Sequence, residues 1–182
     1  MTLCDAHVHF FSPGFFSLLG APDVLARTGW QDPESVAALA DRWVAELDTH
    51  GVARAALIAS LPEDEMSVAE AVRRHPSRFV GFFMLNPLRS DALNRVHQAL
   101  DAGLRGICLF PAMHRYPLAD ERVSQIFQAA AAHPARPVVF VHCGVLSVGV
   151  RRKLGLPSPF EFRYGNPLDV QALAHAYPSV PI

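Results

Sequence analysis

The feature that most constrains the fold of this chain is a regular alternation of short apolar segments and amphipathic segments. Apolar runs rich in β-branched and aromatic residues predict strands at 3–11, 53–60, 79–85, 106–110 and 138–144. Helical periodicity and helix-ending residues predict helices at 32–50, 64–75, 91–103, 120–133 and 167–177. Strands that alternate with helices in this way form parallel sheets with helical crossovers. We therefore expect an α/β fold and a single domain over residues 1–182.

Composition excludes several classes of protein. The net charge of −1 offers no basic surface for nucleic acid or an anionic membrane. No segment approaches the roughly 18 continuous apolar residues of a membrane span, and no signal peptide is visible. The glycine motifs of common nucleotide-binding α/β proteins are missing. The cysteines are three in number and fall in predicted strands, which predicts reduced thiols and a cytoplasmic protein.

Two histidines lie close together in the first predicted strand, within Asp5-Ala6-His7-Val8-His9. Because side chains alternate along a strand, His7 and His9 are expected on one face. The apolar surroundings predict a strand that is buried on both faces. Buried imidazoles are costly unless they are satisfied, either by hydrogen bonds in the core or by a divalent metal ion.

A third histidine, His142, ends the last predicted strand, just before Gly144. Functional groups in parallel α/β proteins gather at the carboxyl ends of strands, where both His9 and His142 stand. We expect His7, His9 and His142 to hold one ion, Zn²⁺ or another divalent metal, with Zn–N distances of about 2.0–2.1 Å if zinc is bound.

A (β/α)8 TIM barrel is the natural fold for metal-binding histidines at strand ends, but it typically needs about 250 residues. The chain has 182 residues and five predicted strands, and residues 178–182 are expected to start a sixth. The sequence therefore predicts the N-terminal part of such a barrel, truncated after about five strands.

The motifs resemble those of the amidohydrolase-related family of metal-dependent barrels. Residues 5–9 look like the family's first-strand metal motif. Residues 103–109 are similar to its fourth strand, residues 139–144 to its fifth, and residues 173–182 to its run into strand six. The resemblance covers essentially the whole chain. It implies a metal-dependent barrel enzyme whose relatives include decarboxylases of aromatic or unsaturated acids and hydrolases of lactones.

Two departures from the family pattern matter. The family normally places a histidine after strand six and an aspartate after strand eight, so the resemblance implies that the acid–base group lies beyond Ile182. Binuclear relatives carry a lysine or glutamate on strand four, where this chain has Cys108 and Phe110. We therefore expect one ion rather than two, with Cys108 as a core residue.

Three further residues are candidates for substrate binding. Asn86 follows the third strand and is expected either to bind substrate or to cap the turn after it. Arg115 follows the fourth strand, where it either grips a carboxylate with two hydrogen bonds or is solvated. Phe11 follows the first strand and is expected to line a pocket or to pack the mouth of the barrel.

The leading functional hypothesis is a metal-dependent hydrolase that acts on a small carboxylic acid, lactone or amide through a metal-activated water. One alternative is a decarboxylase of the same family, and another is a non-catalytic fragment that retains the fold. A phosphoesterase or nuclease with the same first motif would carry a carboxylate on strand four, which Phe110 and its neighbours do not supply. The expected partners are a small-molecule substrate and either an oligomer or a C-terminal segment, of this or another chain, that covers the open barrel.

Overall fold

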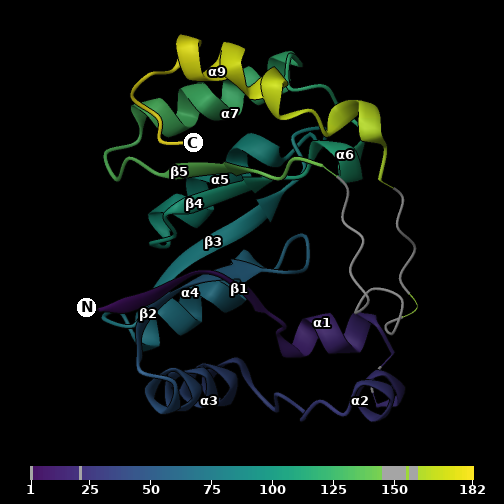
Figure 1. The fold of residues 1–182 in the computed structure, drawn as a ribbon, viewed down its shortest axis with the longest axis vertical. Coiled ribbons are helices and arrows are strands. Elements are labelled where there is room, and N and C mark those ends of the chain that lie inside the picture. The colour runs from purple at the N-terminus through teal and green to yellow at the C-terminus, as the bar shows by residue number, and fades with distance from the viewer. Residues whose placement is uncertain (1, 21, 145–154, 156–159) are drawn as a thin grey trace. The chain divides into compact units, whose positions relative to one another are not determined.

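The computed structural model of the protein describes residues 2–20, 22–144, 155 and 160–182. The chain divides into two compact units. The first comprises Met1–Met84 and Ala102–Leu104, and the second comprises Leu85–Asp101 and Arg105–Ile182. Each unit is built from parallel strands and helices, as the alternation in the sequence predicts (Figure 1).

The first unit contains the strands β1 (Leu3–Phe10), β2 (Val52–Ala59) and β3 (Phe79–Leu85), which pair in parallel in that order. Its helices are α1 (Pro13–Leu18), α2 (Asp23–Thr28), α3 (Val36–Thr49) and α4 (Glu65–Arg74). Both α3 and α4 pack on β2 and on each other (Figure 1). Their contact is reinforced where the Arg74 guanidinium donates two hydrogen bonds of 2.6 Å to the Asp41 carboxylate.

Close packing in this unit explains a glycine in the middle of β3. A Cβ atom at Gly81 would lie 2.3 Å from Leu104 Cδ2 and 2.9 Å from Val68 Cγ1. No ordinary side chain fits at these distances, so α4 can approach β3 this closely only because residue 81 is glycine.

The second unit contains β4 (Gly106–Leu109) and β5 (Val138–Val141), which pair in parallel. Its helical segments are α5 (Ala92–Asp101), α6 (Pro111–His114), α7 (Glu121–Ala132), the 3₁₀ turns η1 (Phe162–Tyr164) and η2 (Pro167–Asp169), and α9 (Val170–Ala176). Helix α7 begins at Asp120, whose carboxylate accepts a hydrogen bond from the Arg122 N–H at 3.0 Å. The rings of Phe127 on α7 and Tyr177 after α9 lie 5.4 Å apart, so these helices are neighbours (Figure 1).

The last residues of the chain run beside β5. The Val139 N–H donates a hydrogen bond of 2.9 Å to the Pro181 carbonyl, and Val180 is buried. This is the arrangement expected if residues 178–182 start a sixth strand next to the fifth.

Burial of β1 differs from the expectation of a strand covered on both faces. Residues 2–7 are exposed, and only Val8 and Phe10 are buried in the strand. The reason is that β1 is the outer strand of its sheet, with β2 as its paired neighbour. Two register irregularities, between Leu3 and Cys4 and between Asp5 and Val8, also interrupt the pairing.

The sequence reasoning also missed α1, α2 and α6. The Ser12 hydroxyl caps α1 by accepting a hydrogen bond from the Phe15 N–H. Proline in the first turn suits this start. Residues 32–35 precede α3 rather than belong to it, because Glu34 has a φ of 58° and Ser35 is the N-cap.

All three cysteines are free thiols, as the sequence predicts. Cys143 lies two residues beyond β5 rather than inside it. Among the residues that the structure describes, no helix has the length and apolar character needed to cross a membrane.

Candidate metal centre

The two histidines of β1 face each other through their ring nitrogens. The Nε2 atoms of His7 and His9 are 3.2 Å apart, and the rings meet at 66° with their centroids 5.0 Å apart. The irregularity of β1 between Asp5 and Val8 includes His7. There the Asp5 carboxylate accepts a hydrogen bond of 2.9 Å from the His7 N–H, which stabilises the local backbone. The expectation that both side chains share a face is confirmed.

This spacing matches the requirement of a single metal ion. Two imidazole nitrogens bound at about 2.0–2.1 Å to one tetrahedral ion lie about 3.3 Å apart. His7 is exposed and His9 is half-buried, so an ion could reach the pair from solvent. The donor set is chemically suitable, because neutral imidazole binds zinc, iron, copper and nickel.

His9 makes a second contact, which the sequence reasoning missed. Its Nδ1 atom lies 2.8 Å from the hydroxyl of Ser60, the residue that follows β2. Ser60 in turn donates a hydrogen bond of 3.1 Å to the Ile58 carbonyl. The signal available in the sequence was a polar residue at a strand end, a position at which parallel α/β proteins place functional groups.

A cavity of about 630 Å³ lies beside the histidine pair, within the first unit. His7, His9 and Phe11 line it together with Trp30 and Trp43. The Phe11 ring is nearly parallel to the His9 ring, at 3° and 5.8 Å, and to the Trp30 ring, at 16° and 5.3 Å. Phe11 therefore both lines the cavity and packs against the metal-ligating candidate.

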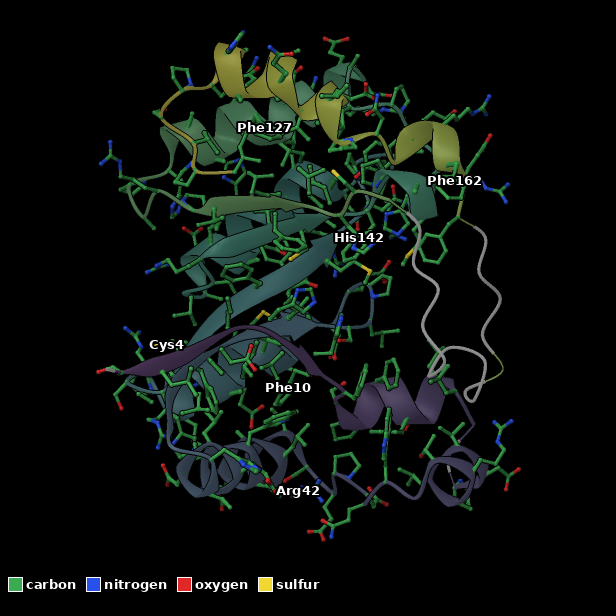
Figure 2. All side chains as sticks on the ribbon, viewed as in Figure 1. Cys4, Phe10, Arg42, Phe127, His142 and Phe162 are labelled. Atoms are coloured by element: carbon green, nitrogen blue, oxygen red, sulfur yellow. The ribbon has the colours of Figure 1, made fainter. Side chains whose placement is uncertain are left out.

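One cation also lines this cavity. Arg42 projects from α3, as Figure 2 shows. Its guanidinium donates hydrogen bonds to the Gln31 side-chain oxygen at 2.9 Å and to the Asp32 carbonyl at 3.2 Å. These bonds hold the loop before α3 in place.

His142 belongs to the second unit, where it directly follows β5 (Figure 2). Its N–H donates a hydrogen bond of 2.8 Å to the Leu109 carbonyl, which continues the pairing of β4 and β5 by one residue. Its ring stacks on the buried ring of Phe110, with centroids 5.3 Å apart and planes at 21°. The predicted position at the carboxyl end of the strand is therefore observed.

Within either unit, the described residues include no group of three or more His, Cys, Asp or Glu side chains that could hold a metal ion. The first unit supplies a pair of nitrogens, and His142 is placed in the other unit. The convergence of His7, His9 and His142 on one ion therefore stays a prediction.

The other two candidates for substrate binding lie in the second unit. Asn86 follows β3, and its side-chain oxygen accepts a hydrogen bond of 3.0 Å from the Leu88 N–H. Asn86 therefore caps the turn after β3, which is one of the two roles expected for it. Arg115 follows α6, is exposed, and ends that helix as a C-cap in the left-handed conformation, with a φ of 58°. Substrate contacts of both residues stay predictions.

Burial shifts the pKa values of Cys108 on β4 and of His114 on α6. Burial raises the pKa of the Cys108 thiol to about 12, so this side chain stays a protonated core residue at neutral pH. Burial lowers the pKa of His114 on α6, which favours its neutral form. Among the described residues, no hydrogen-bond partner faces the buried His114 Nδ1 atom.

Comparison with solved structures identifies the fold. A 5-carboxyvanillate decarboxylase from Novosphingobium aromaticivorans, with bound manganese and 3-methoxy-4-hydroxy-5-nitrobenzoic acid, superimposes with a TM-score of 0.65 and 16% identity. The match covers 98% of this chain and 64% of that one. The corresponding decarboxylase from Sphingomonas paucimobilis gives a TM-score of 0.60 and 15% identity, with coverage of 98% and 65%.

A third structure is a probable 2-pyrone-4,6-dicarboxylic acid hydrolase from Acinetobacter baumannii with bound citric acid. It gives a TM-score of 0.56 and 16% identity, and the match covers 79% of this chain and 50% of that one. The chain thus spans between one half and two thirds of the length of these structures. They confirm the predicted α/β fold, whose five parallel strands match part of a (β/α)8 barrel.

The family itself follows from the sequence. A search of curated proteins gives no match. The family model described as amidohydrolase matches residues 4–182, which include both histidine motifs and all of the described strands except Leu3. The chain belongs to the amidohydrolase family.

Proposed function

We propose that this chain is the metal-binding part of an enzyme that hydrolyses a small carboxylic-acid derivative, lactone or amide. The observation that carries the proposal is the 3.2 Å separation of the His7 and His9 Nε2 atoms. A divalent ion bound there, Zn²⁺ or Mn²⁺, would lower the pKa of a bound water and polarise a substrate carbonyl.

Each histidine has a separate role in this proposal. His7 and His9 hold one side of the ion through Nε2, and His142 contributes a third nitrogen. The hydrogen bond from the His142 N–H to Leu109 supports this role, because it places the side chain at the carboxyl end of β5. The group that moves the proton is proposed to lie beyond Ile182.

The walls of the cavity suggest the shape of the substrate. Phe11 and Trp30 present nearly parallel rings beside His9, and such a wall accepts a planar, conjugated molecule by stacking. Arg115 would pair with a substrate carboxylate, since a guanidinium can make two parallel hydrogen bonds. Asn86 would contribute through its side-chain nitrogen, since its oxygen is engaged with Leu88.

Decarboxylation is the second candidate reaction. The two decarboxylase structures match 98% of this chain with TM-scores of 0.65 and 0.60, whereas the hydrolase matches 79% with a TM-score of 0.56. The same histidines would then hold an ion that binds the substrate carboxylate. The non-catalytic alternative would retain the ion and lose turnover.

The proposed partners are a small-molecule substrate and the remaining strands of a barrel, from a further segment or from a second chain. Unpaired strand edges and apolar surface favour such association. The exposed apolar side chains of Leu3, Leu18 and Ile182 support this proposal. The three free thiols support a reducing compartment such as the cytoplasm.

The test combines metal analysis with two assays. The protein is loaded with Zn²⁺ or Mn²⁺, and turnover is measured as acid formed from lactones and amides and as CO₂ released from aromatic acids. Acid formation supports hydrolysis and CO₂ release supports decarboxylation. Bound ion with neither product from a complete barrel supports the non-catalytic alternative. A metal content equal to that of the His7→Ala/His9→Ala double variant would rule out the proposed centre.

A further inference from the structure

The contact between His9 and Ser60 is fixed by the pairing of two neighbouring strands. In the parallel register of β1 and β2, His9 lies opposite Ile58, and Ser60 follows two residues later. This register brings the Ser60 hydroxyl to 2.8 Å from His9 Nδ1. The same hydroxyl oxygen lies 3.1 Å from the Ile58 carbonyl oxygen. The Ser60 hydroxyl therefore lies between the His9 ring nitrogen and the Ile58 carbonyl oxygen, which can only accept a hydrogen bond.

The hydrogens of this group can be assigned by counting donors. A serine hydroxyl has one hydrogen, and here it is donated to the Ile58 carbonyl. The Ser60 oxygen then has only its lone pairs to offer to His9. The close contact between this oxygen and His9 Nδ1 therefore requires a hydrogen on Nδ1. A neutral imidazole carries one ring hydrogen, which leaves Nε2 without one.

This tautomer directs the lone pair of His9 toward its partner histidine. The His9 Nε2 atom lies 3.2 Å from His7 Nε2 and on the opposite side of the ring from Ser60. The ring of Phe11, stacked at 3° on the ring of His9, limits rotation of the imidazole about its Cβ–Cγ bond. Both the orientation of the His9 ring and the nitrogen that carries its hydrogen are thus set before any ligand arrives.

We propose that Ser60 is a positioning residue, which holds His9 in the Nδ1–H tautomer so that Nε2 can bind a divalent cation. This inference rests on the proposed metal centre for its purpose, but the tautomer itself is a property of the protein without metal. Hydrogen bonds to the second nitrogen of metal-ligating histidines fix the ring and raise its basicity, and their loss typically costs about 10- to 100-fold in metal affinity.

The first experiment measures the tautomer directly. Nitrogen-15 NMR of the metal-free protein, near pH 8.5 and about two units above the ordinary imidazole pKa, distinguishes a protonated from an unprotonated ring nitrogen. We expect His9 to carry its hydrogen on Nδ1 in the wild type and to shift toward the Nε2–H form in Ser60→Ala. A wild-type His9 with its hydrogen on Nε2, or an unchanged tautomer in Ser60→Ala, would overturn the proposal.

The second experiment measures Zn²⁺ binding by titration calorimetry or by competition with a chelator. Ser60→Ala should weaken binding by about 10- to 100-fold, and Ser60→Thr, which keeps the hydroxyl, should bind close to the wild-type value. Ser67→Ala is the matched control, because its hydroxyl donates to the Asp64 carboxylate and belongs to the same β2–α4 region. If Ser67→Ala weakens Zn²⁺ binding equally, the effect arises from disturbance of the β2–α4 region rather than from loss of the contact with His9.

The two readouts separate the two proposals. If the wild type binds no Zn²⁺, the proposed metal centre fails and the NMR tautomer alone decides whether Ser60 orients His9. If the wild type binds Zn²⁺ and Ser60→Ala binds it equally well, the metal centre stands and the role of Ser60 is refuted.

Discussion

The imidazole of His142 lies nearly flat on the ring of Phe110, with the two centroids 5.3 Å apart and the planes at 21°. Phe110 is 4% exposed and follows β4, whereas His142 follows β5, so the stack continues the contact between the two strands beyond their last paired residues. The stack holds the imidazole in one orientation, so binding a ligand would cost it little further side-chain entropy.

This stack leads to the first prediction. Phe110→Ala should lower the free energy of unfolding by about 3–5 kcal/mol, because it removes a buried aromatic ring and leaves a cavity. Phe110→Leu should cost less, since it fills part of the space, but it also removes the stack. Urea denaturation followed by circular dichroism measures both. A loss below about 1 kcal/mol in Phe110→Ala would show that the ring is not a packed core residue.

Gly81 gives the second prediction. Gly81→Ala should destabilise the protein by about 1–3 kcal/mol, because its Cβ would lie 2.3 Å from Leu104 Cδ2 and force the core apart. Gly14→Ala in α1 is the control. There a Cβ meets only the Ser12 hydroxyl at 3.6 Å, and alanine favours the helix by up to about 1 kcal/mol. The midpoint temperature of thermal unfolding should fall in Gly81→Ala and rise in Gly14→Ala. An unshifted Gly81→Ala would contradict the packing of α4 on β3.

The sequence predicted the fold well wherever local signals and tertiary packing agree. The strand at Phe79–Leu85 has the predicted limits, and α7 differs by one residue at each end. It failed for α1, where Ser12 and Pro13 carried both a turn signal and a helix-start signal. Packing favours the helix, in which Phe15 and Phe16 are both buried.

The candidate site shows a similar division. Alternation along a strand was enough to place His7 and His9 on one face, although β1 is irregular at that point. Capping by Asn86, one of the two roles that the sequence left open, is observed, whereas its substrate contact stays a prediction. The contact of Ser60 with His9 joins residues 51 positions apart and depends on the register of β1 and β2, which a single sequence does not reveal.

The third prediction concerns pH. The side chain of Arg122 donates to the Asp120 carboxylate and lowers the pKa of this group to about 2. Because the unfolded-state pKa is near 3.9, the folded protein binds fewer protons, and stability from this group falls as the pH drops from about 4 toward 2. Asp120→Asn keeps a capping side chain without the charge, so its difference from the wild type should be constant above pH 5 and shrink below pH 4.

Unfolding by urea at a series of pH values from 6 to 3 measures this difference. Asp120→Ala removes the cap as well and should cost about 0.5–2 kcal/mol more, at every pH. A difference between wild type and Asp120→Asn that grows as the pH falls would contradict the assigned sign of the pKa shift.

The last prediction concerns the third metal ligand and compares His142 with Cys108. His142→Ala should reduce Zn²⁺ affinity and abolish any turnover of a complete barrel, because it removes a neutral nitrogen donor at the end of β5. Cys108→Ala should leave both unchanged, since burial raises the pKa of this thiol to about 12 and a protonated thiol is a poor ligand. Metal content measured together with unfolding stability separates a lost ligand from a lost fold. If His142→Ala binds Zn²⁺ as tightly as the wild type while His7→Ala and His9→Ala do not, the ion is held by the β1 pair and a donor other than His142. If Cys108→Ala alone loses the ion, the thiolate is a ligand and the site uses sulfur on β4 in place of the histidine on β5.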